Sequence, residues 1–449
     1  MSPELRNAPK PSISMLDAMG LTIGIVVGAG IFATPSLVAA SSNSATTVML
    51  AWALGGLISI AGALAYAELS AAYPHAGGDY HFLMRAFGPR VAFLFGWARI
   101  TVIQTGSIAF LAFVFGDYAS GVVPLGPQSS VIYALIAVAV LTGLNILGVR
   151  EGTRTQNILT AVEVLGVILV IGAGLSVTPA VAAVTAAPAT APASSAFGLM
   201  MVFVLLTYGG WNEAAYISAE LHEVQRNIVR VLVGSLLLVT FLYLAINGVY
   251  LRALGLGGAA QSSQIAADLM RKAMGEPGAV VISILVAIAS LTSANASIMT
   301  GARSAYALGR DVPAFAILGR WDGVRKTPVV ALYVQGFLTV ALVLFGAYTR
   351  GSSINESALR TMIDYTAPVF WLFFLLTGVA LFVLRRREPQ VERPFRVPLF
   401  PITPIAFCVA AAYLLYSSLN YVRSGAIAGL IVLASGVLVM LVVKMKRKV

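Results

Sequence analysis

The fold is decided by the stretch Gly24-Ile25-Val26-Val27-Gly28-Ala29-Gly30-Ile31-Phe32, which lies midway through an apolar segment from Met15 to about Ala40. The segment is long enough to cross a bilayer. Each glycine costs about 1 kcal/mol relative to alanine inside a helix, and Thr34-Pro35 follows soon after the last one. These residues predict a helix that stops and restarts at mid-membrane depth. Because unwound backbone survives there only where it is buried in protein or lines a cavity, the stretch is predicted to form half of a binding site.

The composition identifies the class of protein. Of the 449 residues, 59% are hydrophobic and only 10% are charged, whereas soluble domains carry about 25% charged residues. The chain is therefore predicted to be an all-α polytopic membrane protein. Apolar segments of about 20 residues predict twelve transmembrane helices, at 14–40, 46–72, 91–119, 129–147, 157–176, 196–219, 231–251, 278–302, 328–348, 361–384, 399–419 and 425–443. The polar stretch from Pro74 to Pro89 is predicted to be a short amphipathic helix at the membrane surface.

Positive charges gather on one side of these spans. With the N-terminus inside, 22 of the 29 Lys and Arg lie in inside segments, and one, Arg99, lies within a span. The six in outside segments are Arg252, Arg271, Lys272, Arg350, Arg360 and Arg423. This asymmetry predicts that both termini are cytoplasmic. It also explains the net charge of +11 without a nucleic-acid partner.

A second interruption lies in the sixth span, at Thr207-Tyr208-Gly209-Gly210-Trp211-Asn212-Glu213. Interrupted first and sixth spans occupy matching positions if spans one to five and six to ten form two inverted repeats, which is the arrangement of a transporter site. The alternative is that the glycines only permit close helix packing. The predicted organisation is a cytoplasmic N-terminus 1–13, first repeat 14–176, external loop 177–195, second repeat 196–384, cytoplasmic loop 385–398, two further helices 399–443 and a cytoplasmic tail 444–449.

Several motifs lie in order along nearly the whole chain. They are Gly24 to Pro35, Tyr66-Ala67-Glu68-Leu69, Pro74, Gly77-Gly78-Asp79-Tyr80, Phe87-Gly88, Thr207 to Asn212, Glu220, Arg226-Asn227-Ile228, Asn295, Arg303, Gly309 and Arg393 to Pro398. Together they resemble amino-acid permeases of the amino acid–polyamine–organocation (APC) superfamily, most closely its L-type, or light-subunit, branch. The resemblance implies a LeuT-type fold of five plus five inverted helices, with discontinuous helices 1 and 6 and two extra C-terminal helices. It also implies alternating access and a zwitterionic amino-acid substrate.

Enzyme and channel classes are disfavoured. Gly28 to Ala33 formally fits the pattern G-x-G-x-x-[GA], but no βαβ unit surrounds it. Metal-binding His/Glu motifs and a P-loop are absent from the sequence, as is the ring of charges expected of a pore, and no cofactor is expected. The chain is therefore predicted to be a secondary transporter in the cytoplasmic membrane, the bacterial inner membrane in particular.

The predicted site holds the two charged groups of a free amino acid on backbone atoms. The amides of Ala29, Gly30 and Ile31, at the positive end of a helix dipole, suit the carboxylate, and carbonyls freed at the two breaks suit the ammonium. Asn212 and Asn295 either line the pocket or join helices by hydrogen bonds. The predicted substrate-binding residues are Val26, Gly28, Ala29, Gly30, Ile31, Leu206, Thr207, Tyr208, Gly209, Asn212 and Asn295.

Substrate identity rests on two departures from the family pattern. Ala29 stands where many relatives have Ser, and Leu206 stands where the L-type branch usually has a gating Phe. No buried charged side chain is required by the backbone site. These features favour neutral amino acids with small to medium aliphatic side chains. A cationic amino acid or polyamine antiporter of the same superfamily is the alternative.

Two intramembrane charges are the candidates for energy coupling, because a charge at this depth is costly and usually functional. Arg99 lies about eight residues into the third span and Glu163 about six into the fifth, so both are roughly 10 Å deep. They either form a structural ion pair with each other, or Glu163 takes up a proton or sodium ion during transport. Symport and amino-acid exchange both stay open. A disulfide-linked heavy chain is excluded, because the loop after the third span has no cysteine.

Overall fold

The computed structural model of the chain describes residues 13–75, 77–147, 153–179, 193–322, 325, 327–348, 358–420 and 424–443. Residues 1–12 of the predicted N-terminal segment, 180–192 of the predicted external loop and the tail 444–449 lie outside the described residues. Within these ranges the secondary structure is helical, with two isolated β-bridges and no longer strand. The all-α class is confirmed.

The N-terminal half contains the first broken helix and the bent third span. Its helices are α1 (Met15–Val26), α2 (Gly30–Ala40), α3 (Ala45–Ala72), α4 (Asp79–Phe87), α5 (Pro89–Ala98), the π-helical turn η2 (Arg99–Ile103), α6 (Gln104–Val122), α7 (Ser129–Ile146) and α8 (Thr153–Ser176). Ser14 begins α1 as a side-chain cap, because its hydroxyl accepts the Asp17 N–H at 3.2 Å.

The C-terminal half contains the second broken helix and two long kinked helices. Its helices are α9 (Ala193–Thr207), the 3₁₀ segment η3 (Trp211–Glu220), α10 (Val224–Gln261), α11 (Ile265–Asp311), the short 3₁₀ turn η4 (Pro313–Phe315), α12 (Val329–Tyr348), α13 (Ala358–Arg387), α14 (Ile402–Asn420) and α15 (Ser424–Val442). Gly255 and Gly275 kink α10 and α11, with φ values of 72° and 73° that favour glycine.

Most helices are long enough to cross a membrane. Within the described ranges, nine helices are long and apolar enough to cross a membrane. The bent pair α1–α2, whose axes differ by 42°, makes a tenth span if it is counted as one. The other two predicted spans, 157–176 and 196–219, fall on α8, whose part Thr160–Ser176 is a shorter apolar helix, and on α9 followed by the more polar η3. A multi-pass membrane protein is thus confirmed, whereas the count of twelve stays a prediction.

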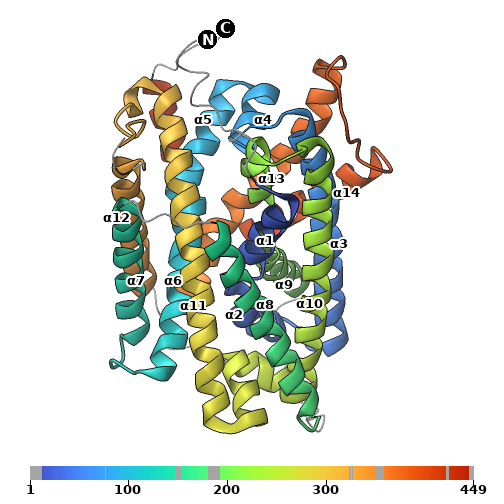
Figure 1. Cartoon of the computed structure of the whole chain (residues 1–449), viewed down its shortest axis with the longest axis vertical. Helices are drawn as coiled ribbons and strands as arrows, with labels where there is room; N and C mark the ends of the chain where they lie inside the picture. Colours follow the sequence, from blue (N-terminus) through green and yellow to red (C-terminus); the bar gives the residue numbers. More distant parts are fainter. Residues whose placement is uncertain are drawn as a thin grey trace.

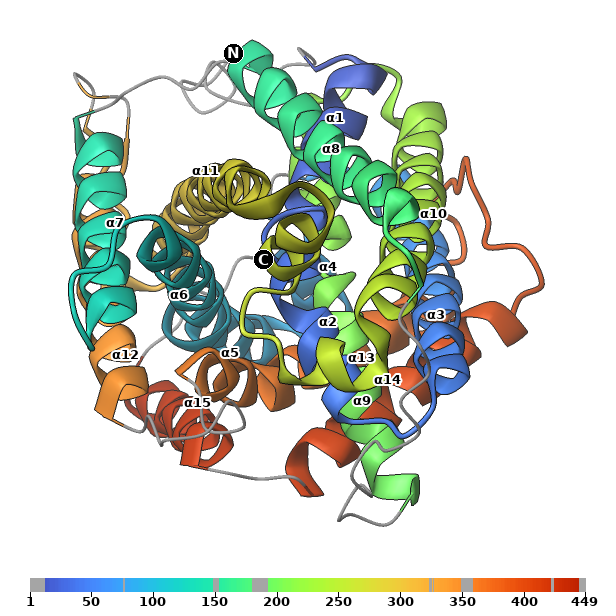
Figure 2. The ribbon, with the colours of Figure 1, turned by 90° about the horizontal axis from the view of Figure 1, so that it is seen from below.

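The broken helices lie inside a ring of longer ones (Figures 1 and 2). Helix α10 packs along α3, α11 packs along α6, and α8 packs against α1, α10 and α11. Figure 2 shows α7, α12 and α15 at the edge of the bundle, α2 near its centre and α1 beside α8. Because helices on all sides cover the breaks, their unwound backbone is shielded from lipid, as a membrane requires.

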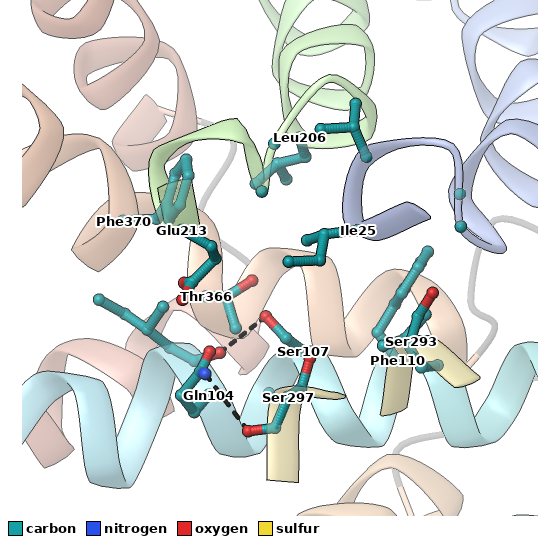
Figure 3. A pocket seen from close by; sticks show the side chains of 18 of the residues that line it. Ile25, Gln104, Ser107, Phe110, Leu206, Glu213, Ser293, Ser297, Thr366 and Phe370 are labelled. Carbon is teal, nitrogen blue, oxygen red and sulfur yellow. Dashed lines mark hydrogen bonds between the residues drawn. The ribbon is translucent and has the colours of Figure 1, made fainter. Parts of the chain in front are cut away.

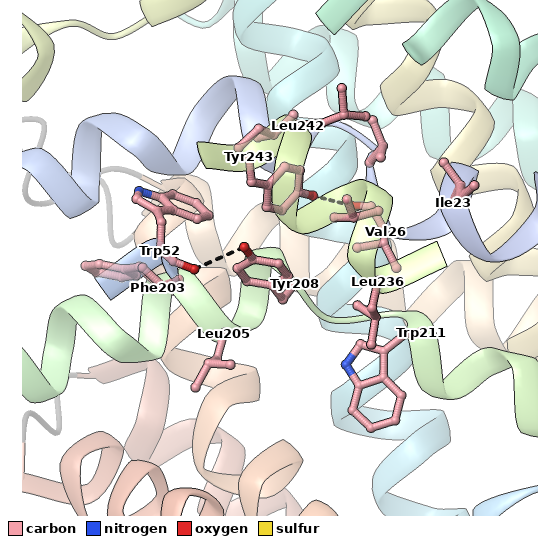
Figure 4. Close-up of a cluster of buried hydrophobic side chains, with 14 of the residues drawn as sticks. Ile23, Val26, Trp52, Phe203, Leu205, Tyr208, Trp211, Leu236, Leu242 and Tyr243 are labelled. Carbon is pink, nitrogen blue, oxygen red and sulfur yellow. Dashed lines mark hydrogen bonds between the residues drawn. The ribbon is translucent and has the colours of Figure 1, made fainter. Parts of the chain in front are cut away.

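An aromatic cluster anchors the two breaks to α3 and α10 (Figure 4). Trp52 and Tyr208 of the core lie against Tyr243 at ring distances of 5.6 and 4.9 Å. The Tyr208 hydroxyl donates to the Trp52 carbonyl at 3.0 Å. All three side chains are fully buried, so this cluster holds the backbone beside the breaks in one position.

A short helix in the stretch from Pro74 to Pro89 is confirmed as α4, which ties four elements together, whereas its place at the membrane surface stays a prediction. Its first residue, Asp79, is buried and accepts hydrogen bonds from the hydroxyls of Tyr66, Tyr216 (3.0 Å) and Thr377 (3.1 Å). These residues belong to α3, η3 and α13. The hydroxyl of Tyr80 donates to a carboxylate oxygen of Asp311, at the end of α11, at 3.1 Å. Helix α4 therefore closes one end of the bundle, on the η3 side of the second break.

A buried acid fixes the loop between α13 and α14. Glu68, near the end of α3, is 1% exposed and accepts two hydrogen bonds from Arg385, one of them at 2.7 Å from Nε. It also accepts the Val397 N–H at 2.7 Å. Because a buried carboxylate needs such partners, the loop packs firmly on α3.

Candidate functional site

The two breaks lie in direct contact with each other. The hydroxyls of Thr34, in α2, and Thr207, at the end of α9, are 2.5 Å apart. Gly210 has φ +103°, and a Cβ there would come 2.6 Å from Cγ2 of Ile25. Glycine is favoured at position 210 because both the left-handed backbone and the close approach of α1 disfavour a side chain.

The first break is equally tight on its other side. A Cβ on Gly28 would overlap the hydroxyl of Ser293 on α11, so glycine lets the two elements meet with Ser293 in its present rotamer. Helix α2 begins at Gly30, and its first amides have no acceptor within the helix. The positive end of its dipole therefore faces the break.

Tyr243 of α10 joins the ends of both interrupted helices. Its hydroxyl lies 2.6 Å from the carbonyl oxygen of Val26, the last residue of α1, and 3.2 Å from that of Thr207, the last residue of α9. One side chain therefore binds the C-terminal carbonyls of two half-helices. Each carbonyl oxygen keeps a second lone pair for a ligand.

A cavity of about 170 Å³ opens beside these breaks (Figure 3). This is similar to the ~150 Å³ apolar cavities that hold a benzene-sized molecule. In Figure 3, Ile25 and Leu206 face Gln104 and Ser107 of α6 across the space. Nine predicted site residues line it: Val26, Gly28, Ala29, Gly30, Arg99, Leu206, Thr207, Gly209 and Asn212.

Four predicted residues do not line the cavity. Ile31 is fully buried, and Tyr208 belongs to the aromatic cluster. Asn295 accepts a hydrogen bond from Asn145 of α7 at 2.6 Å. Of its two predicted roles, it therefore has the second, which is to join two helices by a hydrogen bond. Glu163 lies on α8, away from the cavity, and neither of its buried carboxylate oxygens has a hydrogen-bond partner among the described residues.

Of the two alternatives for Arg99 and Glu163, the one in which they form an ion pair with each other is wrong. Nη2 of Arg99 lies 3.0 and 2.9 Å from the two carboxylate oxygens of Glu213. The reason is packing: α8 packs against α1, α10 and α11, and Figure 2 shows α11 between α8 and α6. Equal depth therefore does not bring Arg99 and Glu163 together.

The Arg99–Glu213 pair stands at the α4 end of the cavity. The guanidinium of Arg99 lies 4.2 Å above the ring of Tyr216, whose hydroxyl bonds Asp79 of α4. Its Nε donates to the hydroxyl of Ser304 on α11 at 2.9 Å. Arg99 also begins the π-helical turn η2, a distortion that is frequent at functional sites.

Sequence reasoning missed a polar face on α11 and another on α6. Ser293, Ala296, Ser297 and Thr300 recur at helical spacing and line the cavity. The side-chain amide of Gln104 donates to the Thr300 hydroxyl at 2.9 Å and to the Ser297 carbonyl at 3.3 Å. Serine and threonine at i, i+4 and i+7 of an apolar span were the signal that could have found this face. The other missed lining residues are Ile25, Thr34, Ile103, Gly106, Ser107, Phe110, Leu111, Gly210, Glu213, Ile363, Thr366 and Phe370.

Comparison with known proteins identifies the family. The family model described as amino acid permease matches residues 13–443. The chain is 30% identical to the b(0,+)-type amino acid transporter 1 of Mus musculus over 411 residues, covering 90% of this chain and 81% of that protein. It is also 30% identical to the large neutral amino acids transporter small subunit 2 of Homo sapiens over 424 residues, covering 92% of this chain and 76% of that protein.

These matches extend over nearly all of the described helices, including both breaks and the cavity between them. They agree with the multi-pass helical fold and with a cavity that is built from unwound backbone. The relatives are transporters and not enzymes. The chain therefore belongs to the amino acid permease family, as an L-type-like member of the APC superfamily that transports amino acids.

Proposed function

We propose that the chain is a secondary active transporter of neutral amino acids, working by alternating access across the bacterial cytoplasmic membrane. The observation that carries this proposal is the cavity at the two helix breaks. It offers backbone hydrogen-bond donors and acceptors at the breaks, and its other walls combine apolar side chains with the polar faces of α6 and α11. The positive-inside pattern of the sequence supports cytoplasmic termini.

The substrate's carboxylate binds at the start of α2. The amides of Ala29, Gly30 and Ile31 precede or open this helix, where unpaired N–H groups and the helix dipole favour an anion. A backbone site of this kind holds a carboxylate without any lysine or arginine. It is also insensitive to which side chain the substrate carries.

The substrate's ammonium binds carbonyl oxygens at the ends of α1 and α9. Those of Val26 and Thr207 share the single hydroxyl proton of Tyr243, with Val26 the nearer acceptor, so each keeps a lone pair for a ligand. The carbonyls of Leu206 and Gly209 belong to the same turn. The two breaks thus separate the donor and acceptor groups that a zwitterion requires.

The size and lining of the cavity favour small to medium aliphatic side chains. Its volume of about 170 Å³ must hold the backbone of the substrate as well as its side chain. Leu206, Phe110 and Phe370 supply apolar contacts (Figure 3). The alternative, a cationic amino acid or polyamine antiporter, would need an acidic group left available for the substrate, whereas Glu213 is paired with Arg99.

Glu163 is the candidate for coupling to a proton or sodium ion. It is 4% exposed, both of its carboxylate oxygens lack hydrogen-bond partners among the described residues, and α8 packs on α1. A buried carboxylate without partners favours binding a cation, and α1 is the half-helix that must move in alternating access. If Glu163 binds none, exchange of one amino acid for another is the remaining mode.

A covalently attached partner subunit is not part of the proposal. The only cysteine of the chain, Cys408, lies in α14, a membrane-spanning helix. It is therefore not placed to form an external disulfide with a second chain.

Uptake into liposomes by the purified protein tests these assignments. Radiolabelled alanine, leucine, phenylalanine, tryptophan and tyrosine are compared, with and without a pH gradient, sodium and internal amino acid. We expect saturable uptake that favours alanine and leucine. Strong preference for tryptophan or tyrosine would refute the size assignment.

The variant Glu163→Gln tests coupling, with Glu276→Gln, an exposed acid outside the cavity, as its control. Loss of pH or sodium dependence in Glu163→Gln alone is the expected result. If both dependences are unchanged, Glu163 has no coupling role and exchange is favoured.

A further inference from the structure

Charge is scarce in the wall of the cavity. Of the described residues that line it, only Arg99 and Glu213 are charged. Their side chains are 3% and 14% exposed, so both lie out of bulk solvent and Glu213 is the more accessible. In such a setting an unpaired charge is costly, and a charged ligand interacts strongly with it.

The pair is held rigidly by its surroundings. Arg99 donates to both oxygens of Glu213 and to Ser304, and its guanidinium lies on the ring of Tyr216. Tyr216 is fixed in turn by its hydrogen bond to Asp79. Neither partner is free to turn towards a substrate while the other remains.

The pair occupies one end of an elongated cavity. Lining residues on the third span extend from Arg99 to Leu111, a distance of roughly 18 Å along the helix. The helix breaks that we propose to bind the substrate's backbone groups line the same cavity. A side chain that points towards α4 therefore meets Arg99 and Glu213.

We infer that the Arg99–Glu213 pair is the charge filter of this transporter, which restricts the cavity to substrates with uncharged side chains. A cationic side chain meets Arg99 and an anionic one meets Glu213, and each would have to lose its hydration without gaining a free partner. A neutral side chain meets a pair whose charges cancel. The inference rests on the proposed function, since it assigns the residues that set its substrate class.

The filter predicts opposite changes when either partner is neutralised. In Arg99→Gln, Glu213 is left unpaired and attracts lysine, arginine or ornithine. In Glu213→Gln, Arg99 is left unpaired and attracts glutamate or aspartate. The double variant carries neither charge, so it returns to neutral substrates without favouring either charged class.

Competition for leucine uptake in liposomes measures these changes. We expect the ratio of inhibition constants for lysine and leucine to shift at least tenfold towards lysine in Arg99→Gln. The ratio for glutamate and leucine should shift at least tenfold towards glutamate in Glu213→Gln. The matched controls are Arg85→Gln and Glu388→Gln, which neutralise an exposed ion pair of 2.7 Å outside the cavity and should change neither ratio.

Loss of one partner of a buried pair also destabilises a protein, so two further measurements are included. The exchanged pair, Arg99→Glu with Glu213→Arg, keeps the cavity neutral and should exclude both charged classes. Wild-type protein itself should be inhibited at least tenfold more weakly by lysine and by glutamate than by leucine.

The outcomes separate the filter from the proposed function. If wild type takes up no neutral amino acid, the proposed function fails. If wild type takes up leucine but accepts lysine or glutamate equally well, the filter alone is wrong. The filter is also wrong if the single variants lose uptake of all substrates in parallel with unchanged ratios, since the pair is then only structural.

Discussion

The hydroxyl of Tyr243 is the sharpest single-atom test of how the two breaks are held. Tyr243→Phe removes one oxygen that lies 2.6 Å from the Val26 carbonyl and 3.2 Å from the Thr207 carbonyl. Each hydrogen bond contributes about 1 kcal/mol net, and stranding a buried acceptor raises the cost to 1–3 kcal/mol. Because the two carbonyls share one hydroxyl proton, we expect the free energy of unfolding to fall by about 1–3 kcal/mol.

The matched control is Tyr250→Phe. Tyr250 lies two turns further along α10, is equally buried, and has a hydroxyl without a hydrogen-bond partner among the described residues. Its loss should cost less than about 1 kcal/mol. Reversible unfolding in mixed micelles measures both values, and uptake assays should show a raised KM for Tyr243→Phe only. Equal destabilisation by the two variants would refute the bridging role.

Two further predictions concern the α4 end of the bundle. Glu68→Gln breaks the buried pair with Arg385 and should lower the free energy of unfolding by about 3 kcal/mol. The control Glu388→Gln breaks an exposed pair and should cost ~1 kcal/mol. A loss in Glu68→Gln no larger than in this control would contradict the prediction. Burial, with the nearby charge of His75 second, lowers the pKa of His81 to about 4 from 6.5. Between these values the unfolded chain binds more protons, so stability falls as pH drops from 6.5 towards 4. The free energy of unfolding, measured between pH 6.5 and 4, should fall less steeply with decreasing pH in His81→Gln than in wild type. Identical slopes in the two proteins would argue against a lowered pKa of His81.

The breaks were predictable because their causes are local. Glycines at Gly28, Gly30, Gly209 and Gly210 weaken a helix wherever they occur, and a membrane tolerates the weakness only in a buried place. The structure adds the reasons for two of them: Gly28 meets Ser293, and Gly210 meets Ile25 with a positive φ. Those neighbours lie far away in sequence, so they were not predictable from it.

The side of each helix that faces the cavity was not predictable. Asn295 and Ser293 are at almost the same depth, yet Ser293 lines the cavity and Asn295 bonds α7. Residues two positions apart in a helix are 200° apart around its axis. Ser293 therefore points towards the cavity while Asn295 points away from it. The hydropathy of the sequence predicts how deep a residue lies in the membrane. It does not predict the rotation of a helix about its own axis when both faces of the helix are buried.

The sequence by itself determined the class, the apolar spans and the two interrupted helices, because these follow from composition, length and backbone preference. Only the tertiary structure decided that Arg99 pairs with Glu213 and that Glu163 stands alone. Judged by depth alone, Glu163 and Glu213 could each pair with Arg99. In the folded chain α11 lies between Glu163 and Arg99, whereas Glu213 is in contact with Arg99. An ion pair depends on which helices are neighbours and how each is rotated, and packing of the whole bundle decides both.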